Sequence, residues 1–207
     1  MQIFNLPNSL TLLRILLIPV FTYFFVKGEY RIALIIFVVT GLTDMVDGFL
    51  ARRLRKKTTL GAILDPTADK LLMLVTFIVL AMRALVPPWL SFLVILRDLW
   101  IAVGIWILQH LKKKLYFKPT RLSKLNTFFQ LFTIFLAFLL TFLQAERPAF
   151  LINFEAWVQQ ALYYVVYVCA GMTMASTIQY TRIGIHILRK GREYADLPLE
   201  KDQTGRQ

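Results

Sequence analysis

The chain has 207 residues, of which 57% are hydrophobic and 17% are charged, and its formal net charge is +12. Ordinary globular domains carry more charge than this, and no polar stretch is long enough for a separate soluble domain. The composition therefore excludes an ordinary soluble protein and predicts one domain built from membrane helices.

Six apolar runs approach the ~20 residues that a helix needs to cross a bilayer. They cover residues 10–26, 31–50, 60–82, 87–109, 125–144 and 152–179. The sequence thus predicts an all-α integral membrane protein with six transmembrane helices. We expect residues 1–192 to form a single catalytic membrane domain and residues 193–207 to form a polar, flexible tail.

Basic residues are distributed unevenly between the connections. Five lie between the second and third runs, six between the fourth and fifth, and six after the sixth run. The opposite connections hold only Lys27, Arg31, Arg83 and Arg147. This is the positive-inside pattern, which predicts that both termini and the two basic loops face the cytoplasm of a multi-pass protein in a bacterial-type inner or plasma membrane. The same placement favours anionic lipid headgroups as partners and argues against nucleic acid.

Acidic and small residues interrupt the second and third apolar runs. On ideal helices each set falls within an arc of about 100°. The sets are Asp44, Asp47, Gly48 and Ala51 on the second run, and Gly61, Asp65, Ala68 and Asp69 on the third. Each face therefore combines carboxylates with missing side-chain bulk, which indicates either space for a ligand or close helix packing.

Four carboxylates at these positions call for a partner, because each charge inside a span costs ~2.5–3.5 kcal/mol on insertion scales. Unpaired, they would also repel one another and take up protons. Carboxylate oxygens suit Mg²⁺, Mn²⁺ or Ca²⁺, and four of them can hold two ions ~3.5–4 Å apart. Arg52, at the border of the acidic face, is suited to binding phosphate oxygens beside such ions.

The complete spacing reads Asp44-x2-Asp47-Gly48-x2-Ala51-Arg52-x8-Gly61-x3-Asp65-x3-Asp69. It resembles the signature of the CDP-alcohol phosphotransferase family at all eight positions. The resemblance implies a six-helix homodimer that transfers a substituted phosphoryl group from a CDP-linked donor to an alcohol and releases CMP. It also implies a pair of Mg²⁺ or Mn²⁺ ions held by the four aspartates, with Asp69 as the base. The residues implied for CDP binding are Gly48, Ala51, Arg52 and Gly61.

Two further stretches, NLPNSLTLLRILLIP and LDPTADK, resemble both phosphatidylglycerophosphate synthases and CMP-forming cardiolipin synthases. They imply CDP-diacylglycerol as donor at the cytoplasmic face, with glycerol 3-phosphate as the first acceptor expected and phosphatidylglycerol as the alternative. The segments LRD (96–98) and KPTRLSKLNTFFQ (118–130) look more like the cardiolipin enzymes. A metal-ion transporter is a remote alternative, since it would place acids in helices but would not need Arg52.

The acceptor pocket is expected to hold a phosphate group. Arg97 is a candidate because a cation in the middle of an apolar run needs an anion, although Asp98 or a metal-site aspartate is an equal alternative partner. Lys124 and Thr127 are candidates because they share one helical face. Three more polar residues recur every third position and span about 120° of one helix. They are Asn8, for which helix capping is the simpler role, Thr11 and Arg14.

Overall fold

The computed structural model describes residues 6–54, 61–111, 120–146 and 152–190, with side chains at 11–43, 67–108, 110, 120–145 and 153–188. Within these ranges the regular structure is entirely helical. The helices are α1 (Leu6–Lys27), α2 (Tyr30–Leu54), α3 (Gly61–Met82), α4 (Pro88–Leu111), α5 (Arg121–Glu146) and α6 (Ile152–Lys190). The all-α class and the six predicted helices are thus confirmed.

Four helix boundaries differ from those predicted by four residues or more. Helix α1 begins at Leu6 rather than at residue 10, and α2 ends at Leu54 rather than at residue 50. Helix α5 begins four residues earlier than its apolar run, because Thr120 caps it: the Ser123 backbone N–H donates to Thr120 Oγ1 at 3.1 Å. Helix α6 continues to Lys190 rather than ending near 179. Its last turns mix isoleucines with basic residues, so they are helical without being continuously apolar.

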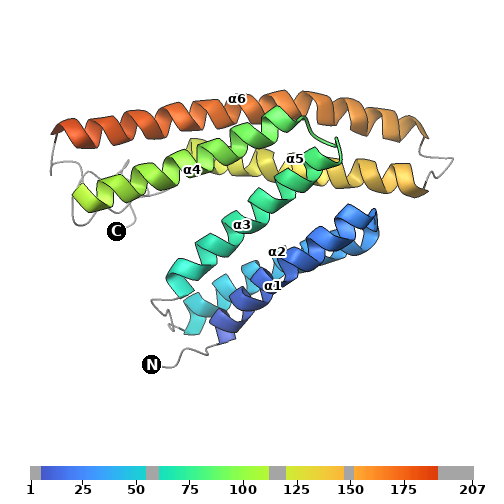
Figure 1. Ribbon diagram of the computed structural model, residues 1–207, viewed down its shortest axis with the longest axis horizontal. Coiled ribbons are helices and arrows are strands. Elements are labelled where there is room, and N and C mark those ends of the chain that lie inside the picture. Colours follow the sequence, from blue (N-terminus) through green and yellow to red (C-terminus); the bar gives the residue numbers. More distant parts are fainter. Residues whose placement is uncertain (1–5, 55–60, 112–119, 147–151, 191–207) are drawn as a thin grey trace, which may run out of the picture.

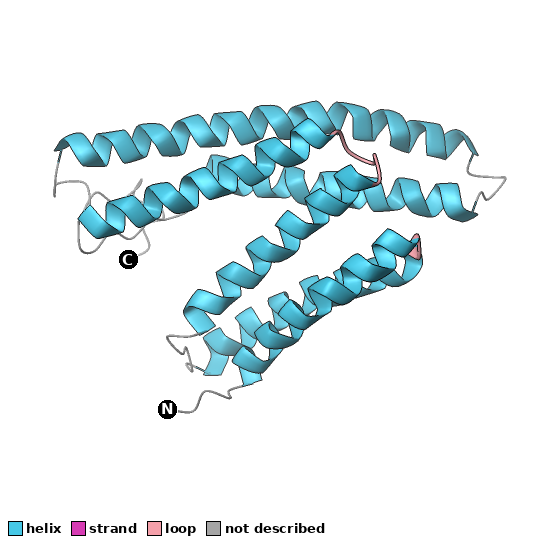
Figure 2. Ribbon diagram, viewed as in Figure 1, coloured by secondary structure: helices cyan, strands magenta, loops and turns pink. Residues whose placement is uncertain are grey.

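The helices form two groups (Figure 1). Helices α4, α5 and α6 run alongside one another, and α6 extends over the whole length of this group. Helices α1 and α2 form an antiparallel hairpin, and α3 packs on α1 and leads obliquely to α4. The turns at 28–29 and 83–87 lie at one end, here called the turn end (Figure 2). Away from the turn end the two groups diverge (Figure 1). Helices α1 and α3 begin and α2 ends at one tip, while α5 begins and α4 and α6 end towards the other; the two tips together are here called the far end.

The two turns are tied to each other. Gly28 has φ +86°, in the left-handed region that favours glycine, and closes the α1–α2 turn. Arg83, from the α3–α4 turn, donates from Nη2 to the Val26 carbonyl in the last turn of α1. A Cβ at Gly28 would lie 3.5 Å from this Nη2 atom. The turn end is therefore a single connected unit.

The core beside the turn end is aromatic. Phe21 and Phe25 of α1 and Phe138 of α5 are at most 2% exposed. The rings of Phe25 and Phe138 lie 5.3 Å apart and edge to face, and Phe37 of α2 lies 5.4 Å from Phe138. Such aromatic pairs contribute beyond simple burial, so this cluster fixes α1 and α2 against α5.

The outer surface is that of a membrane protein. Among the described residues, three helices are long and apolar enough to cross a bilayer, over 88–108, 121–145 and 153–188, and residues 30–43 form a shorter apolar segment. Large apolar side chains remain exposed on α4, including Phe92 at 66% and Trp106 at 60%. An outer surface of this kind suits lipid rather than water.

Candidate functional site

A cavity of about 550 Å³ lies between α3 and α4 and reaches α5 and α6. Its aliphatic walls come mainly from α3 and α4. Its polar lining consists of Thr67, Lys70, Arg97, Asp98, Ser123 and Tyr180. Four helices thus bring hydrogen-bonding groups to one hollow near the far end.

Arg97 is the centre of this cavity. Its side chain is 4% exposed, and Nη1 donates to Asp98 Oδ1 at 2.6 Å. Nη2 donates to the hydroxyls of Ser123 at 3.0 Å and Ser176 at 2.7 Å. The guanidinium carbon lies 5.8 Å from the centre of the Tyr180 ring. Arg97 Nε is buried and has no hydrogen-bond partner among the described residues.

Asp98 bridges two cations. Its second oxygen, Oδ2, accepts a hydrogen bond from Lys70 Nζ at 2.9 Å, which joins α4 to α3. The Lys70 side chain is 50% exposed and that of Asp98 is 21% exposed. The predicted alternative partner of Arg97 is therefore the one observed, and Lys70 extends the network towards the acidic segment of α3.

Hydrogen bonds at the interface between α5 and α6, here called the α5–α6 seam, position Ser123 and Ser176. Thr120 Oγ1 donates to Gln179 Oε1 at 2.8 Å, and Thr173 Oγ1 donates to Asn126 Oδ1 at 2.8 Å. These two bonds flank Ser123 on α5 and Ser176 on α6, so they fix the register of the helices at that level. Ser123 and Ser176 can then reach the same guanidinium nitrogen.

The four aspartates lie on α2 and α3 near the far end. Their helices are described, but of these side chains only that of Asp69 is; it is exposed and directly precedes Lys70. The predicted side chains outside the described part are Asn8, Asp44, Asp47, Gly48, Ala51, Arg52, Gly61 and Asp65. A set of carboxylates on two helices joined by six residues fits a divalent cation in its donor chemistry.

The other predicted acceptor residues are not part of the cavity lining. Lys124 is exposed, and Thr127 Oγ1 donates back to the Ser123 carbonyl of its own helix at 3.1 Å. Thr11 and Arg14 are buried on the inward face of α1, at 0% and 1% exposure. Of the predicted acceptor residues with described side chains, only Arg97 therefore reaches this cavity.

The residues that were not predicted are Thr67, Lys70, Ser123 and Tyr180 of the cavity lining, and Ser176, which contacts Arg97. A usable signal existed for Lys70, because it follows Asp69 directly in the acidic segment. Ser176 lies three positions after the buried Thr173 on one face of α6. Serines are common in apolar helices, so only the structure shows that these contact Arg97.

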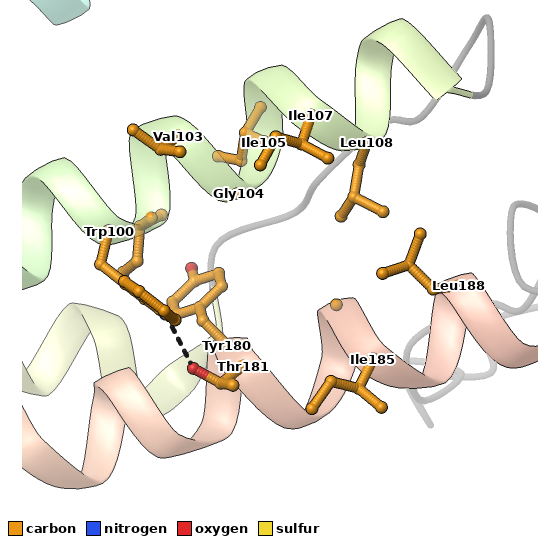
Figure 3. Close-up of a pocket in the computed structure, with 12 residues that line it drawn as sticks. Trp100, Val103, Gly104, Ile105, Ile107, Leu108, Tyr180, Thr181, Ile185 and Leu188 are labelled. Carbon is orange, nitrogen blue, oxygen red and sulfur yellow. Dashed lines mark hydrogen bonds between the residues drawn. The ribbon is translucent and has the colours of Figure 1, made fainter.

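A second, apolar cavity of about 230 Å³ adjoins the first between α4 and α6 (Figure 3). Trp100 and Tyr180 lie at one end and Leu108 and Leu188 at the other. Trp100 Nε1 donates to Thr181 Oγ1 at 3.0 Å across the two helices. Both cavities are lined by Ile101, Ile105 and Tyr180. Polar and apolar hollows thus meet along one stretch of α4.

Comparison with known proteins identifies relatives with shared sequence over much of the chain. The human protein named cardiolipin synthase (CMP-forming) is 34% identical over 148 residues, covering 63% of this chain and 48% of the relative. The protein of Bacillus subtilis named CDP-diacylglycerol–glycerol-3-phosphate 3-phosphatidyltransferase is 38% identical over 110 residues, covering 46% of this chain and 57% of the relative. A protein of the same name from Aquifex aeolicus is 33% identical over 127 residues, covering 60% and 70%.

The chain thus spans about half the length of several of these relatives. The family model for CDP-alcohol phosphatidyltransferase matches residues 4–173, which include the aspartate signature, Arg97 and the start of the α5–α6 seam. The chain therefore belongs to the CDP-alcohol phosphatidyltransferase family.

Proposed function

We propose that this protein transfers the phosphatidyl group of CDP-diacylglycerol to a hydroxyl of an acceptor that carries a glycerol phosphate, with release of CMP. The observation that carries the proposal is the buried Arg97, whose Nε has no hydrogen-bond partner among the described residues, in a cavity that also contains Lys70, the residue after Asp69. Buried cations of this kind recognise phosphate. The cavity therefore brings an acceptor phosphate close to the acidic segment.

The donor is assigned to the neighbouring α2–α3 segment. Asp44, Asp47, Asp65 and Asp69 are the residues that would hold two Mg²⁺ or Mn²⁺ ions, which when bound would neutralise charge on the diphosphate. Gly48, Ala51, Arg52 and Gly61 are the residues assigned to CDP.

In the reaction, Asp69 accepts the proton of the acceptor hydroxyl. The acceptor oxygen then attacks the β-phosphorus, and CMP leaves with its charge balanced by Arg52. Positioning and electrostatics supply most of the rate enhancement.

Two acceptors follow from the family. Glycerol 3-phosphate is the first expectation from the sequence, and it is the acceptor named in the Bacillus and Aquifex relatives. Phosphatidylglycerol is the second candidate, because the human cardiolipin synthase matches a longer part of this chain. Both present a free hydroxyl on a glycerol that carries phosphate.

We place the protein in a bacterial-type membrane with six spans, both termini in the cytoplasm and the far end facing the cytoplasm. Three observations support this topology: the positive-inside distribution of charge, the three long apolar helices among the described residues, and the position of the start of α1 and the end of α6, both of which lie away from the turn end. The homodimer remains a proposal from the family resemblance.

The test is a transfer assay with purified protein in detergent and CDP-diacylglycerol, with each acceptor supplied in turn. We expect CMP release and a new lipid in equal amounts, loss of both on chelation, and recovery with Mg²⁺ or Mn²⁺. Absence of CMP release with either acceptor and either metal would overturn the proposed function.

A further inference from the structure

A shallow groove follows the outer surface between α1 and α3, on the half of the bundle nearer the turn end. It is lined by one face of α1 from Ile18 to Lys27 and by Val75 of α3. Among the described residues, it shares no lining residue with the two cavities beside α4. The groove is therefore separate from the candidate functional site.

The length and the chemistry of this groove fit one acyl chain. From Ile18 to Lys27 it extends about 14 Å along α1, which is close to the ~15 Å of hydrocarbon in one leaflet of a bilayer. Its wall includes the exposed side chains of Tyr23 and Val26. Thr22 donates its hydroxyl to the Ile18 carbonyl at 2.8 Å, so this donor is already satisfied within the helix. An aliphatic chain can thus lie against the wall without leaving a buried donor unpaired.

Two cations lie at the turn-end mouth of the groove. Lys27 Nζ lies over the Tyr23 ring, 4.6 Å from its centre, and Arg83 donates from Nη2 to the Val26 carbonyl. Tyr23 and Val26 both line the groove. An ammonium and a guanidinium are therefore held beside one end of an apolar groove, which is the arrangement that the phosphate and the chain of a lipid require.

These cations are not balanced by acids within the described part of the chain. The ends of α1 and α3 and the beginning of α2 contain three basic residues and one acidic residue, a net charge of +2: Lys27, Arg31, Arg83 and Glu29. Neither Lys27 nor Arg83 forms an ion pair with a described carboxylate. Arg83 gives one of the five N–H groups of a guanidinium to Val26. Donors therefore remain for the oxygens of an anion.

We propose that this groove binds one anionic phospholipid from the leaflet at the turn end, with an acyl chain along α1 and the phosphate between Lys27 and Arg83. Basic residues at the ends of membrane helices attract anionic headgroups, and the chain adds apolar contact. The inference does not rest on the proposed function and requires only that the protein lies in a bilayer. Because Arg83 also joins the two turns, the lipid braces the turn end from outside.

The experiment locates the lipid on the chain without depending on turnover. Full-length purified protein is placed in phosphatidylcholine nanodiscs that contain a small fraction of a lipid with a photoactivatable diazirine in its acyl chain. The anionic probe is phosphatidylmethanol, which has no free hydroxyl and cannot serve as an acceptor, and the zwitterionic probe is phosphatidylcholine. Labelled peptides are quantified by mass spectrometry. We expect the anionic probe to label residues 18–26 at least about fivefold more than the zwitterionic probe.

Two variants separate the charge from the groove. Lys27→Gln should lower this labelling ratio about fivefold, the contribution of one basic residue near a membrane surface, and it should fold because Lys27 is exposed. Val75→Phe fills the groove from α3 and should lower the same ratio although every charge is retained. The matched control is Lys124→Gln, an exposed lysine near the start of α5, which should leave the ratio for residues 18–26 unchanged.

Equal labelling of residues 18–26 by the two probes would overturn the inference, since it would show ordinary boundary lipid. An unchanged ratio in Lys27→Gln, or an equal fall in Lys124→Gln, would do the same, because the preference would then come from general attraction to a basic protein. Loss of the preference on adding inorganic phosphate at constant ionic strength would mean that the cations bind the free ion instead. Failure of the proposed function, seen as absent CMP release, would leave the labelling pattern unaffected.

Discussion

The turn-end half and the far-end half of the bundle are built from the same helices, but their interiors differ: the first is aromatic and closely packed, and the second is polar and hollow. Near the turn end, Phe25 and Phe138 are fully or almost fully buried and pack edge to face. Near the far end, the corresponding space holds a hollow of about 550 Å³ and the buried cation of Arg97. The packed half can hold the helices in place, and this allows the other half to keep an open cavity beside Arg97, whose Nε has no partner among the described residues.

Along the interface between α5 and α6, the buried residues change gradually from polar to mostly apolar. Ser123 and Ser176 contact Arg97, and Asn126 and Thr173 bond to each other. Beyond them most buried residues are apolar, with Gln130, Thr133 and Thr141 as buried polar residues among them. Asn126 Nδ2 is buried without a hydrogen-bond partner among the described residues. Gln130 Nε2, about one turn further along α5, is in the same state. Each such group costs about 1–3 kcal/mol.

The largest effect is expected from removing the proposed base. Asp69→Asn keeps the size of the side chain but cannot accept a proton, so kcat should fall about 10²–10⁴-fold. The thermal unfolding temperature should remain close to wild type, because this half of the bundle is not the half that stabilises the fold. The variant should still bind a CDP-linked donor, with weaker affinity because the metal site has lost one charged ligand. Near-normal turnover would remove Asp69 as base and as metal ligand.

A stability experiment tests the opposite half. Phe138→Ala should lower the free energy of unfolding by about 3–5 kcal/mol through loss of buried contacts, while KM for donor and acceptor stays unchanged. Phe135→Ala is the matched control, since Phe135 is on the same helix but is 55% exposed. Equal destabilisation by the two variants, measured by thermal unfolding in detergent, would mean that the aromatic cluster does not fix the bundle.

The third prediction concerns the acceptor. Arg97→Met should raise the acceptor KM about tenfold to a hundredfold, since a charge-assisted hydrogen bond is worth ~1.5–3 kcal/mol. Asp98 would still be paired with Lys70. Lys124→Ala, a basic residue outside the cavity lining, should change KM by less than about threefold on the scale of surface charges. A larger effect at Lys124 than at Arg97 would restore the acceptor site expected from the sequence.

The smallest effect is expected in the apolar cavity between α4 and α6. No atom lies within 4 Å of a Cβ built at Gly104, which lines this cavity, or at Gly171, which faces outward on α6. Leucine at either position gains about 0.8–1 kcal/mol of helix propensity. Gly104→Leu should gain about 1 kcal/mol more, from packing against α6. Identical unfolding temperatures for the two variants would indicate that the cavity is too open to pack the new side chain.

The sequence predicted the helices because long apolar runs leave few alternatives. It missed the beginning of α5, where Thr120 rather than an apolar residue starts the helix, and the end of α6, where basic residues interrupt the run. It predicted Arg97 and its alternative partner Asp98 because a charge inside a span needs compensation. It did not predict Lys70 or Ser176, since their roles come from contacts between helices that are far apart in the chain.

The bond from Arg83 to the Val26 carbonyl has a mechanical consequence. It joins the base of the α1–α2 hairpin to the junction of α3 and α4, and α3 also packs along α1. The first three helices are therefore held together both along their length and at the turn end. The aspartates of α2 and those of α3 are thus carried on one unit, although Asp69 lies about 21 Å along α3 from Arg83.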